Sequence, residues 1–345
     1  MVTKKVVFAG AAALLGSLVA MPQAIAQTGG QQQFVSAEPS SSQTVTANSD
    51  SSVQPSTSNT TAPGHLSSAL GIGPKSRIHI NGFLSTGLAW TDTNAEYVDP
   101  NHGTIDNEMN WAPLSLVGLQ FTADLARHLQ VVTQLVGDGD DTDGNVAYRL
   151  NVEWAFLRYA VNENYQIEIG RFRLPAFTYS LTEQVGYSYP WVMLPDEVYR
   201  IVPFNNVNGI TFITRHPLFG AGWNITSQIY YGGNKSRYDV YNAAFPTGVT
   251  VDFDESALAG IVLSIGNSNF TIRGSYATLK LSGDFKGVEP LVPPTTLFSS
   301  VRTTFYSIGA KLNFWHFLLM GEFASRQTPD NIAALNGYYG SLGLK

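Results

Sequence analysis

Apolar and polar residues alternate one by one along most of this chain, and this alternation restricts the fold more than any other feature. After Arg77, Ile78 and Ile80 alternate with His79 and Asn81. A period of two places successive side chains on opposite faces of an extended strand. The sequence therefore predicts half-buried β-strands with one apolar face each. Later apolar faces are Val117, Leu119 and Phe121; Leu150, Val152, Trp154 and Phe156; Trp223, Ile225 and Ile229; and Tyr306, Ile308, Ala310 and Leu312.

The connections between these segments alternate in length. Short turns at one end of the strands and long loops at the other end are typical of an up-and-down antiparallel array. We count twelve strands between Ile78 and Lys345. Short turns are expected near 126–128, 162–164, 217–220, 266–268 and 315–316, and long polar loops near 93–112, 138–147, 174–206, 233–252, 283–302 and 327–334.

Two folds could bury such strands: a soluble β-sandwich or barrel with the apolar face inward, and a membrane barrel with that face toward lipid. Polar faces rich in Gln, Asn, Arg and Glu would be costly in a dry core but suit a wet interior. Aromatic residues lie near the strand ends, where a membrane barrel carries an interfacial girdle. We therefore predict an all-β fold, a transmembrane antiparallel up-and-down β-barrel. The aromatic residues in question are Trp90, Trp111, Trp154, Tyr159, Trp223 and Trp315.

Composition excludes several classes of function. The chain has 20 Lys and Arg against 26 Asp and Glu, and no Cys. So few basic residues cannot build a strongly basic face, so we expect no nucleic-acid partner. Without thiols there is no disulfide scaffold, Cys-ligated metal or cysteine nucleophile. Catalytic motifs and metal-ligand spacing of the six histidines are also missing from the sequence, so we expect neither an enzyme nor a cofactor.

In this setting the chain resembles Gram-negative outer-membrane porins, in particular the phosphate- and polyphosphate-selective type. The resemblance is carried by the opening strand 78–83 (IHINGF) and by the motif 170–175 (GRFRLP). It covers the body, 77–345, and implies a homotrimer in outer-membrane lipid and lipopolysaccharide. Porins of this type have sixteen or more strands, so the sequence is expected either to be truncated at Lys345 or to form a true twelve-stranded barrel.

The segments before the body are expected to serve export and tethering. Residues 1–26 read as a signal peptide, with Lys4 and Lys5 ahead of an apolar run and an A-x-A site at 24–26. An N-terminal membrane anchor is the alternative. Residues 27–76 are rich in Ser, Thr and Gln and are expected to be disordered. A periplasmic tether and a peptidoglycan contact are both open for this segment.

The connection 174–206 is the main candidate for a functional site. It is too long for a simple turn, and it carries seven aromatic residues that a water-exposed loop would not need. We expect it to fold inward and narrow the pore, with Asp196 and Glu197 facing Arg171 and Arg173 of the wall. Opposed charges across a constriction sort ions by charge. The alternative is an external loop or a trimer contact. Other candidates along the solute path are Glu183, Arg200, Arg149 and Glu153, and strand parity also places Asp124, Glu168, Arg273, Lys311 and Glu322 in the interior.

An acidic run is a weak candidate for a metal site. It contains Asp138, Asp140, Asp141 and Asp143, but it fails the EF-hand pattern because Thr142 takes a ligand position and Arg149 replaces the final Glu. A divalent ion bridging to lipopolysaccharide and a simple charged turn are both open.

Taken together, these features predict an outer-membrane porin for passive diffusion of small hydrophilic solutes or ions. A non-channel barrel that acts as an adhesin or envelope anchor is the alternative.

Overall fold

The structure is a computed structural model of the 345-residue chain. It describes residues 78–344 except 93–96, 100–102, 141–146, 219, 221, 243–244, 287–292 and 330–333. The expected signal peptide and tail, 1–26 and 27–76, lie outside the described residues. In the described part of the chain, no helix has the length and apolar character needed to cross a membrane.

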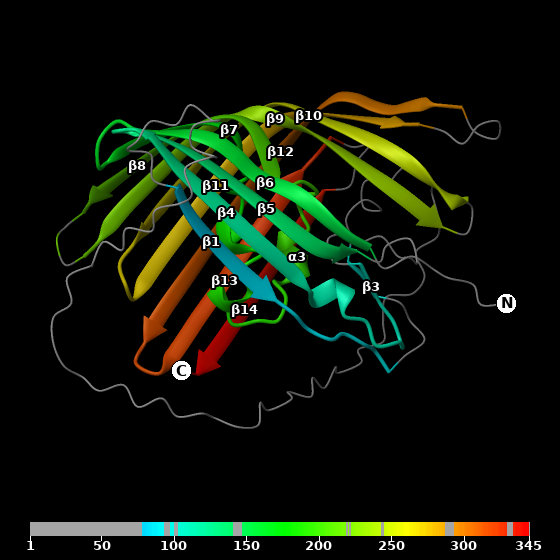
Figure 1. Cartoon of the computed structure of the whole chain (residues 1–345), viewed down its shortest axis with the longest axis horizontal. Coiled ribbons are helices and arrows are strands. Elements are labelled where there is room, and N and C mark those ends of the chain that lie inside the picture. Colours follow the sequence, from blue (N-terminus) through cyan, green and yellow to red (C-terminus); the bar gives the residue numbers. More distant parts are fainter. Residues whose placement is uncertain are drawn as a thin grey trace, which may run out of the picture. The chain divides into compact units, whose positions relative to one another are not determined.

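Twelve antiparallel strands form one sheet in which each strand pairs with the next along the chain (Figure 1). This confirms the predicted all-β meander and its strand count. A separate pair, β2 (Tyr97–Asp99) and β3 (Gly103–Ile105), lies within the connection from β1 to β4. The twelve strands are β1 (Ile78–Ser85), β4 (Leu116–Ala126), β5 (Leu129–Asp140), β6 (Ala147–Ala160), β7 (Tyr165–Arg173), β8 (Asn206–Pro217), β9 (Asn224–Asn242), β10 (Phe245–Gly266), β11 (Phe270–Phe285), β12 (Thr295–Phe314), β13 (Phe317–Gln327) and β14 (Leu335–Leu344).

The predicted short turns all connect neighbouring strands, and two of them share one side-chain device. The Asn162 side-chain oxygen accepts hydrogen bonds from the backbone N–H groups of Asn164 and Tyr165, at 2.8 and 3.0 Å. The Asn267 oxygen likewise accepts from the N–H groups of Asn269 and Phe270, at 2.9 and 2.8 Å. An Asn that bonds to the backbone two or three residues ahead stabilises a tight reversal.

Two of the expected long loops are wrong, because strands occupy much of them. Residues 233–242 belong to β9 and 245–252 to β10, and β11 and β12 extend into 283–302 in the same way. Polar and charged pairs join these extensions, including Arg237 Nε to Asp252 at 2.8 Å and Thr296 Oγ1 to Asp284 at 2.8 Å. Their polar composition resembles that of a loop, and cross-strand charge pairing allows a strand instead.

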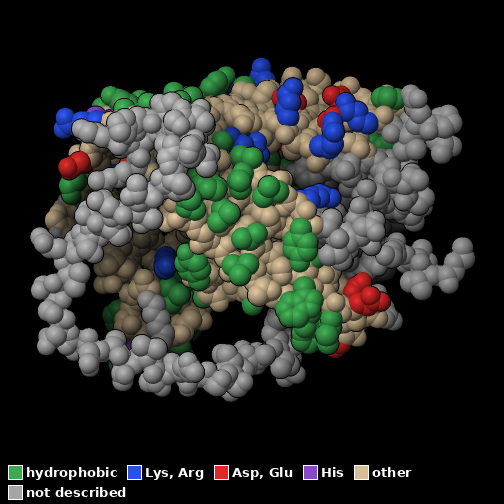
Figure 2. All heavy atoms as spheres, viewed as in Figure 1, with side chains coloured by type: hydrophobic (Ala, Val, Ile, Leu, Met, Phe, Trp, Pro, Cys, Tyr) green, Lys and Arg blue, Asp and Glu red, His purple; other side chains and the backbone are tan. Residues whose placement is uncertain are grey.

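The sheet has an apolar outer face, with exposed large apolar side chains on eleven of its twelve strands, all but β5. On β12 the outer residues Tyr306, Ile308 and Leu312 are 39, 53 and 37% exposed, as the period-two pattern predicted for this strand. Figure 2 shows apolar side chains spread over the outer face at β1 and β4, with Lys, Arg and acidic side chains gathered near the extended strand ends. Other outer residues are Ile80, Leu84, Val117, Leu119, Leu150, Ile169, Ile210, Ile229, Ile261, Leu319 and Leu342.

The predicted face of β6 is wrong in its second half. Cross-strand pairing slips by one residue there, because Gln134 and Leu135 of β5 pair with Trp154 and Val152, which leaves Glu153 as an extra residue. Such a bulge reverses which residues face which side. Trp154 is therefore partly buried and Phe156 is 8% exposed, both against the core instead of lipid. Trp154 is thus no part of an aromatic girdle.

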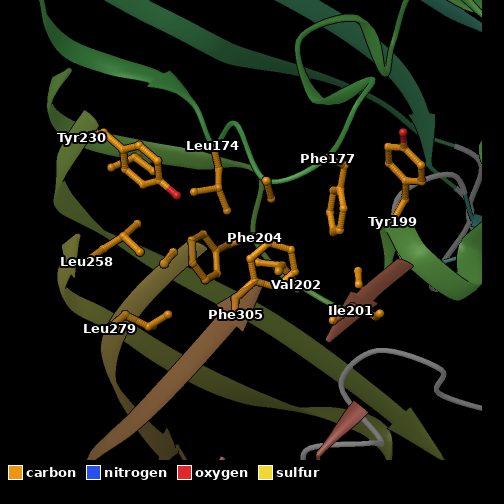
Figure 3. Close-up of a cluster of buried hydrophobic side chains, with 14 of the residues drawn as sticks. Leu174, Phe177, Tyr199, Ile201, Val202, Phe204, Tyr230, Leu258, Leu279 and Phe305 are labelled. Carbon is orange, nitrogen blue, oxygen red and sulfur yellow. The ribbon is translucent and has the colours of Figure 1, made fainter. Parts of the chain in front are cut away.

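The opposite, inner face of the sheet carries a core instead of being polar throughout. The core joins strand residues such as Leu258, Leu279 and Phe305 to residues 174–205, which connect β7 to β8. In Figure 3, Leu174, Phe204 and Phe305 point toward one another across this contact. The expected polar interior is therefore wrong for part of β10–β12, where the connection removes apolar side chains from water.

Candidate constriction site

The connection 174–205, here called the inner segment, lies on the inner face of the sheet. It contains two short 3-10 turns, η2 (Ser180–Thr182) and η3 (Gly186–Ser188), and one helical turn, α3 (Asp196–Tyr199). Pro195, in an extended conformation, is the N-cap of α3, and the Ser180 hydroxyl accepts a hydrogen bond from the Phe177 N–H at 2.8 Å. These local bonds fix the segment's shape, and the contacts below fix its position.

The carbonyl oxygen of Ala176 is held by three donors from β11 and β12. The hydroxyls of Ser275 and Ser307 both donate to it at 2.7 Å, and Arg273 Nη1 donates at 3.3 Å. Arg273 Nη2 also donates to the carbonyl of Pro175 at 2.5 Å. Since all of these groups are buried or half-buried, the bonds are worth more than they would be in water. They attach the start of the inner segment to the middle of the wall.

The Glu322 carboxylate of β13 makes a second attachment. It accepts hydrogen bonds from the Thr178 N–H at 2.9 Å, the Tyr199 hydroxyl at 3.2 Å and the Tyr339 hydroxyl at 3.4 Å. Burial, together with the negative charge of Glu322, raises the pKa of the Tyr199 hydroxyl. Tyr199 therefore keeps its proton and acts as a donor to the carboxylate. One buried carboxylate thus joins both ends of the inner segment to the wall.

A third attachment places α3 directly on β14. The backbone of Glu197 approaches Gly337 so closely that a Cβ at Gly337 would lie 1.7 Å from the Glu197 carbonyl oxygen. Next to this contact, Arg326 Nη1 donates to the Ile201 carbonyl at 3.0 Å. The side chain of Arg326 is buried, and its Nε and Nη2 have no hydrogen-bond partner within the part of the chain that the structure describes.

The charged residues do not form the expected opposed pairs. Arg173 is buried between Glu153, at 2.6 Å, and Glu183, which also accepts from it. Asp196 pairs with Arg200 on its own helical turn, at 3.0 Å. Asp196 and Glu197 therefore do not face Arg173 as predicted. The reason is that the bulge at Glu153 supplies a carboxylate beside Arg173, and Arg200 lies one turn after Asp196.

Arg171 and Arg149 lie away from these pairs. In the β7–β8 ladder Arg171 is opposite Asn208 and follows the outer-face residue Ile169, and its Nε donates to the Val152 carbonyl at 3.0 Å. Its expected place in the constriction is therefore wrong. Arg149 is exposed near the beginning of β6, opposite Asp138.

The acidic run falls largely outside the described side chains. Asp141 and Asp143 are not described, nor is the side chain of Asp140, and Asp138 accepts a bond from Asn151 at 3.4 Å. Among the described residues, no group of three or more His, Asp or Glu side chains could hold a metal ion.

A cleft, here called the β1–β4 cleft, separates part of the inner segment from the opposite wall. On the wall side it is lined by Ser85, Pro113, Leu114 and Leu116, which come from β1, the 3-10 turn η1 (Ala112–Leu114) and the start of β4. On the segment side it is lined by Glu183, Gln184, Gly186, Tyr189, Val192, Met193, Leu194, Asp196, Tyr199 and Arg200. Burial raises the pKa of the Asp196 carboxyl in this lining, and the Arg200 guanidinium opposes that rise.

Strand parity found some of the residues that fix the inner segment and missed others. Arg273 and Glu322 were expected in the interior, where they are. Arg326 and Gly337 were missed, because neither residue type signals a close approach of a segment more than a hundred residues away. Seven aromatic residues in one connection were the signal that it packs against a wall, and the packing is observed.

No protein-family model matches the sequence, and no curated protein matches it either. Several solved outer-membrane proteins are similar to it. For the CymD monoaromatic hydrocarbon channel, identity is 11%, coverage is 78% of this chain and 79% of that chain, and the TM-score is 0.32. For OmpT of Vibrio cholerae, in its trimer form, identity is 11%, coverage is 78% of this chain and 83% of that chain, and the TM-score is 0.36. For the outer membrane channel DcaP of Acinetobacter baumannii, identity is 10%, coverage is 77% of this chain and 97% of that chain, and the TM-score is 0.28.

Proposed function

We propose that this chain is a porin of a Gram-negative outer membrane, through which small hydrophilic solutes or ions diffuse passively. The observation that carries the proposal is the contrast between the two faces of one sheet. Apolar side chains cover the exposed outer face, while the inner face holds an ordered segment and several buried charges. This is the arrangement that a membrane barrel requires, because lipid covers the outer face and water reaches the interior.

Exposure of the outer face to water would be costly. Leu84 and Leu342 are 73 and 65% exposed, and exposed apolar side chains occur on all the other strands of the sheet except β5. Each large apolar side chain that moves fully from water into an apolar phase contributes about 1.5–3 kcal/mol. Contiguous apolar surface of this kind marks a contact with protein or lipid. A surface that extends over eleven of the twelve strands, all but β5, favours lipid.

The route for solutes is proposed to be the β1–β4 cleft. The inner segment is attached by hydrogen bonds to β11, β12 and β13, and α3 packs on β14, so that side of the interior is filled. The cleft on the other side is lined by both polar and apolar groups. A segment fixed on one wall with an open cleft toward the other would narrow the path without closing it.

The other expected properties belong to the same proposal. Export through 1–26, a tether formed by 27–76, contact with lipopolysaccharide and assembly as a homotrimer all remain proposals. Selectivity for phosphate is not supported by the two arginines of the 170–175 motif. Arg173 is paired with two carboxylates and Arg171 follows the outer face.

The test is single-channel recording of the purified full chain in planar lipid bilayers. Stepwise openings are expected. A variant in which a short Gly–Ser linker replaces 184–193 keeps Glu183 and all the attachments described above, and should conduct more because one side of the cleft is removed. Openings of unchanged size in this variant would contradict the constriction. If the folded protein gave no openings, the porin proposal would be wrong and the adhesin or anchor alternative would be favoured.

A further inference from the structure

We infer that the β1–β4 cleft selects cations, and that the carboxylates of Glu183 and Asp196 are the groups that do so. The inference rests on the proposed porin function and adds the class of solute. It depends on which partner of each ion pair is exposed to the cleft, not on the number of acidic residues alone.

In both ion pairs at the cleft, the acidic partner is the more exposed one. The side chain of Arg173 is 3% exposed, against 15% for its partner Glu183. Arg200 is 9% exposed, against 32% for Asp196. Arg173 therefore lies behind Glu183 and does not line the cleft, whereas Arg200 lines it but is less exposed than Asp196. A solute that passes therefore meets mainly carboxylate oxygens, while the positive charges are the more enclosed members of the pairs.

The charges around the cleft also do not cancel. Arg173 serves two carboxylates, those of Glu153 and Glu183. Among the described residues that line the cleft, the carboxylates of Glu183 and Asp196 thus stand against the guanidinium of Arg200, which leaves a net charge of −1 if all are ionised.

The opposite side of the cleft does not compensate this charge. None of the residues that line this side has an ionisable side chain; they are Ser85, Pro113, Leu114 and Leu116. The low-dielectric walls of a narrow path concentrate the field of the charges that line it. A cation such as K⁺ or a small alkylammonium ion is therefore stabilised in the cleft. An anion is repelled by the carboxylates, and the guanidinium N–H groups that could bind it are more enclosed.

The closing experiment measures the reversal potential of single channels in a KCl gradient. The wild-type channel should pass cations more readily than anions. Glu183→Gln leaves the Arg173–Glu153 pair in place, and Asp196→Asn leaves Arg200 facing the cleft with one carboxylate fewer. Each should lower the cation permeability and raise the anion permeability about threefold, so the cation-to-anion permeability ratio should fall about tenfold, as expected from Coulomb's law for one charge at about 6 Å in water. Asp196→Glu should restore it.

Glu163→Gln is the matched control, because Glu163 is exposed in the turn from β6 to β7, and it should leave the ratio unchanged. Anion preference in the wild-type channel, or a ratio unchanged in both cleft variants, would overturn cation selection while stepwise openings still support the porin. Absence of openings from the folded wild-type protein would overturn the porin proposal and the inference with it. The effect should also weaken at 1 M salt, where the Debye length is about 3 Å.

Discussion

At the scale of single residues, the position of the inner segment depends on a few buried groups that each contact several partners. Glu322 accepts three donors from three parts of the chain, and the Ala176 carbonyl accepts three donors from two strands. Buried groups of this kind are costly when a partner is missing, so they specify one arrangement. The segment is therefore held by hydrogen bonds of defined geometry as well as by apolar contact.

Gly337→Ala tests whether this arrangement depends on close backbone approach. The added Cβ would lie 1.7 Å from the Glu197 carbonyl oxygen, so α3 must move away from β14 and toward the cleft. We expect a loss of stability of about 1–3 kcal/mol, typical of overpacking, and a smaller conductance. Urea unfolding in detergent micelles and single-channel recording measure the two effects. Gly343→Ala, on the same face of β14 with its nearest contact at 3.6 Å, is the control and should behave as wild type. Equal behaviour of the two variants would contradict the close contact.

At the scale of elements, the turns illustrate how local sequence determines the hairpins. Asn267→Ala removes the acceptor for two backbone N–H groups at the β10–β11 turn. We expect a loss of about 0.5–1.5 kcal/mol for each hydrogen bond removed, partly regained by solvation of the freed groups. The rate of unfolding in urea should rise accordingly. Ser268→Ala in the same turn is the control, because the substitution keeps the Ser268 backbone oxygen that accepts from Asn313. If both variants unfold at the same rate, the Asn267 side chain does not stabilise the turn.

Most elements could be predicted from the sequence because period two and turn residues are local signals. The strand count and the short turns were correct for this reason. The bulge at Glu153 could not be predicted, since a slip of register depends on pairing with β5. The ion pair of Arg173 with Glu153 follows from that bulge, so the charge pattern of the site was missed with it. The extended ends of β9–β12 were missed because exposed strands joined by charge pairs have the composition of loops.

At the scale of the whole molecule, the proposal requires that adjacent residues of one strand face different solvents. Leu119 of β4 is 44% exposed on the outer face, and Gln120 lies on the inner face opposite Gln134 and Asn81. In a soluble protein, a lysine at Leu119 would simply be hydrated. In a membrane barrel it would enter the lipid, at a cost of about 2–4 kcal/mol near the middle of the bilayer.

Leu119→Lys should therefore reduce folding into lipid vesicles strongly, whereas Gln120→Lys should be tolerated because its ammonium group reaches interior water. The fraction of folded protein is read from the mobility of unheated samples on gels and from tryptophan fluorescence across a urea series. If the two variants fold equally well, β4 does not separate lipid from water. The sheet would then need another partner for its outer face, such as a protein surface, and the porin proposal would lose its main support. If only Leu119→Lys is impaired, the same alternation that predicts the strands also determines which face meets lipid.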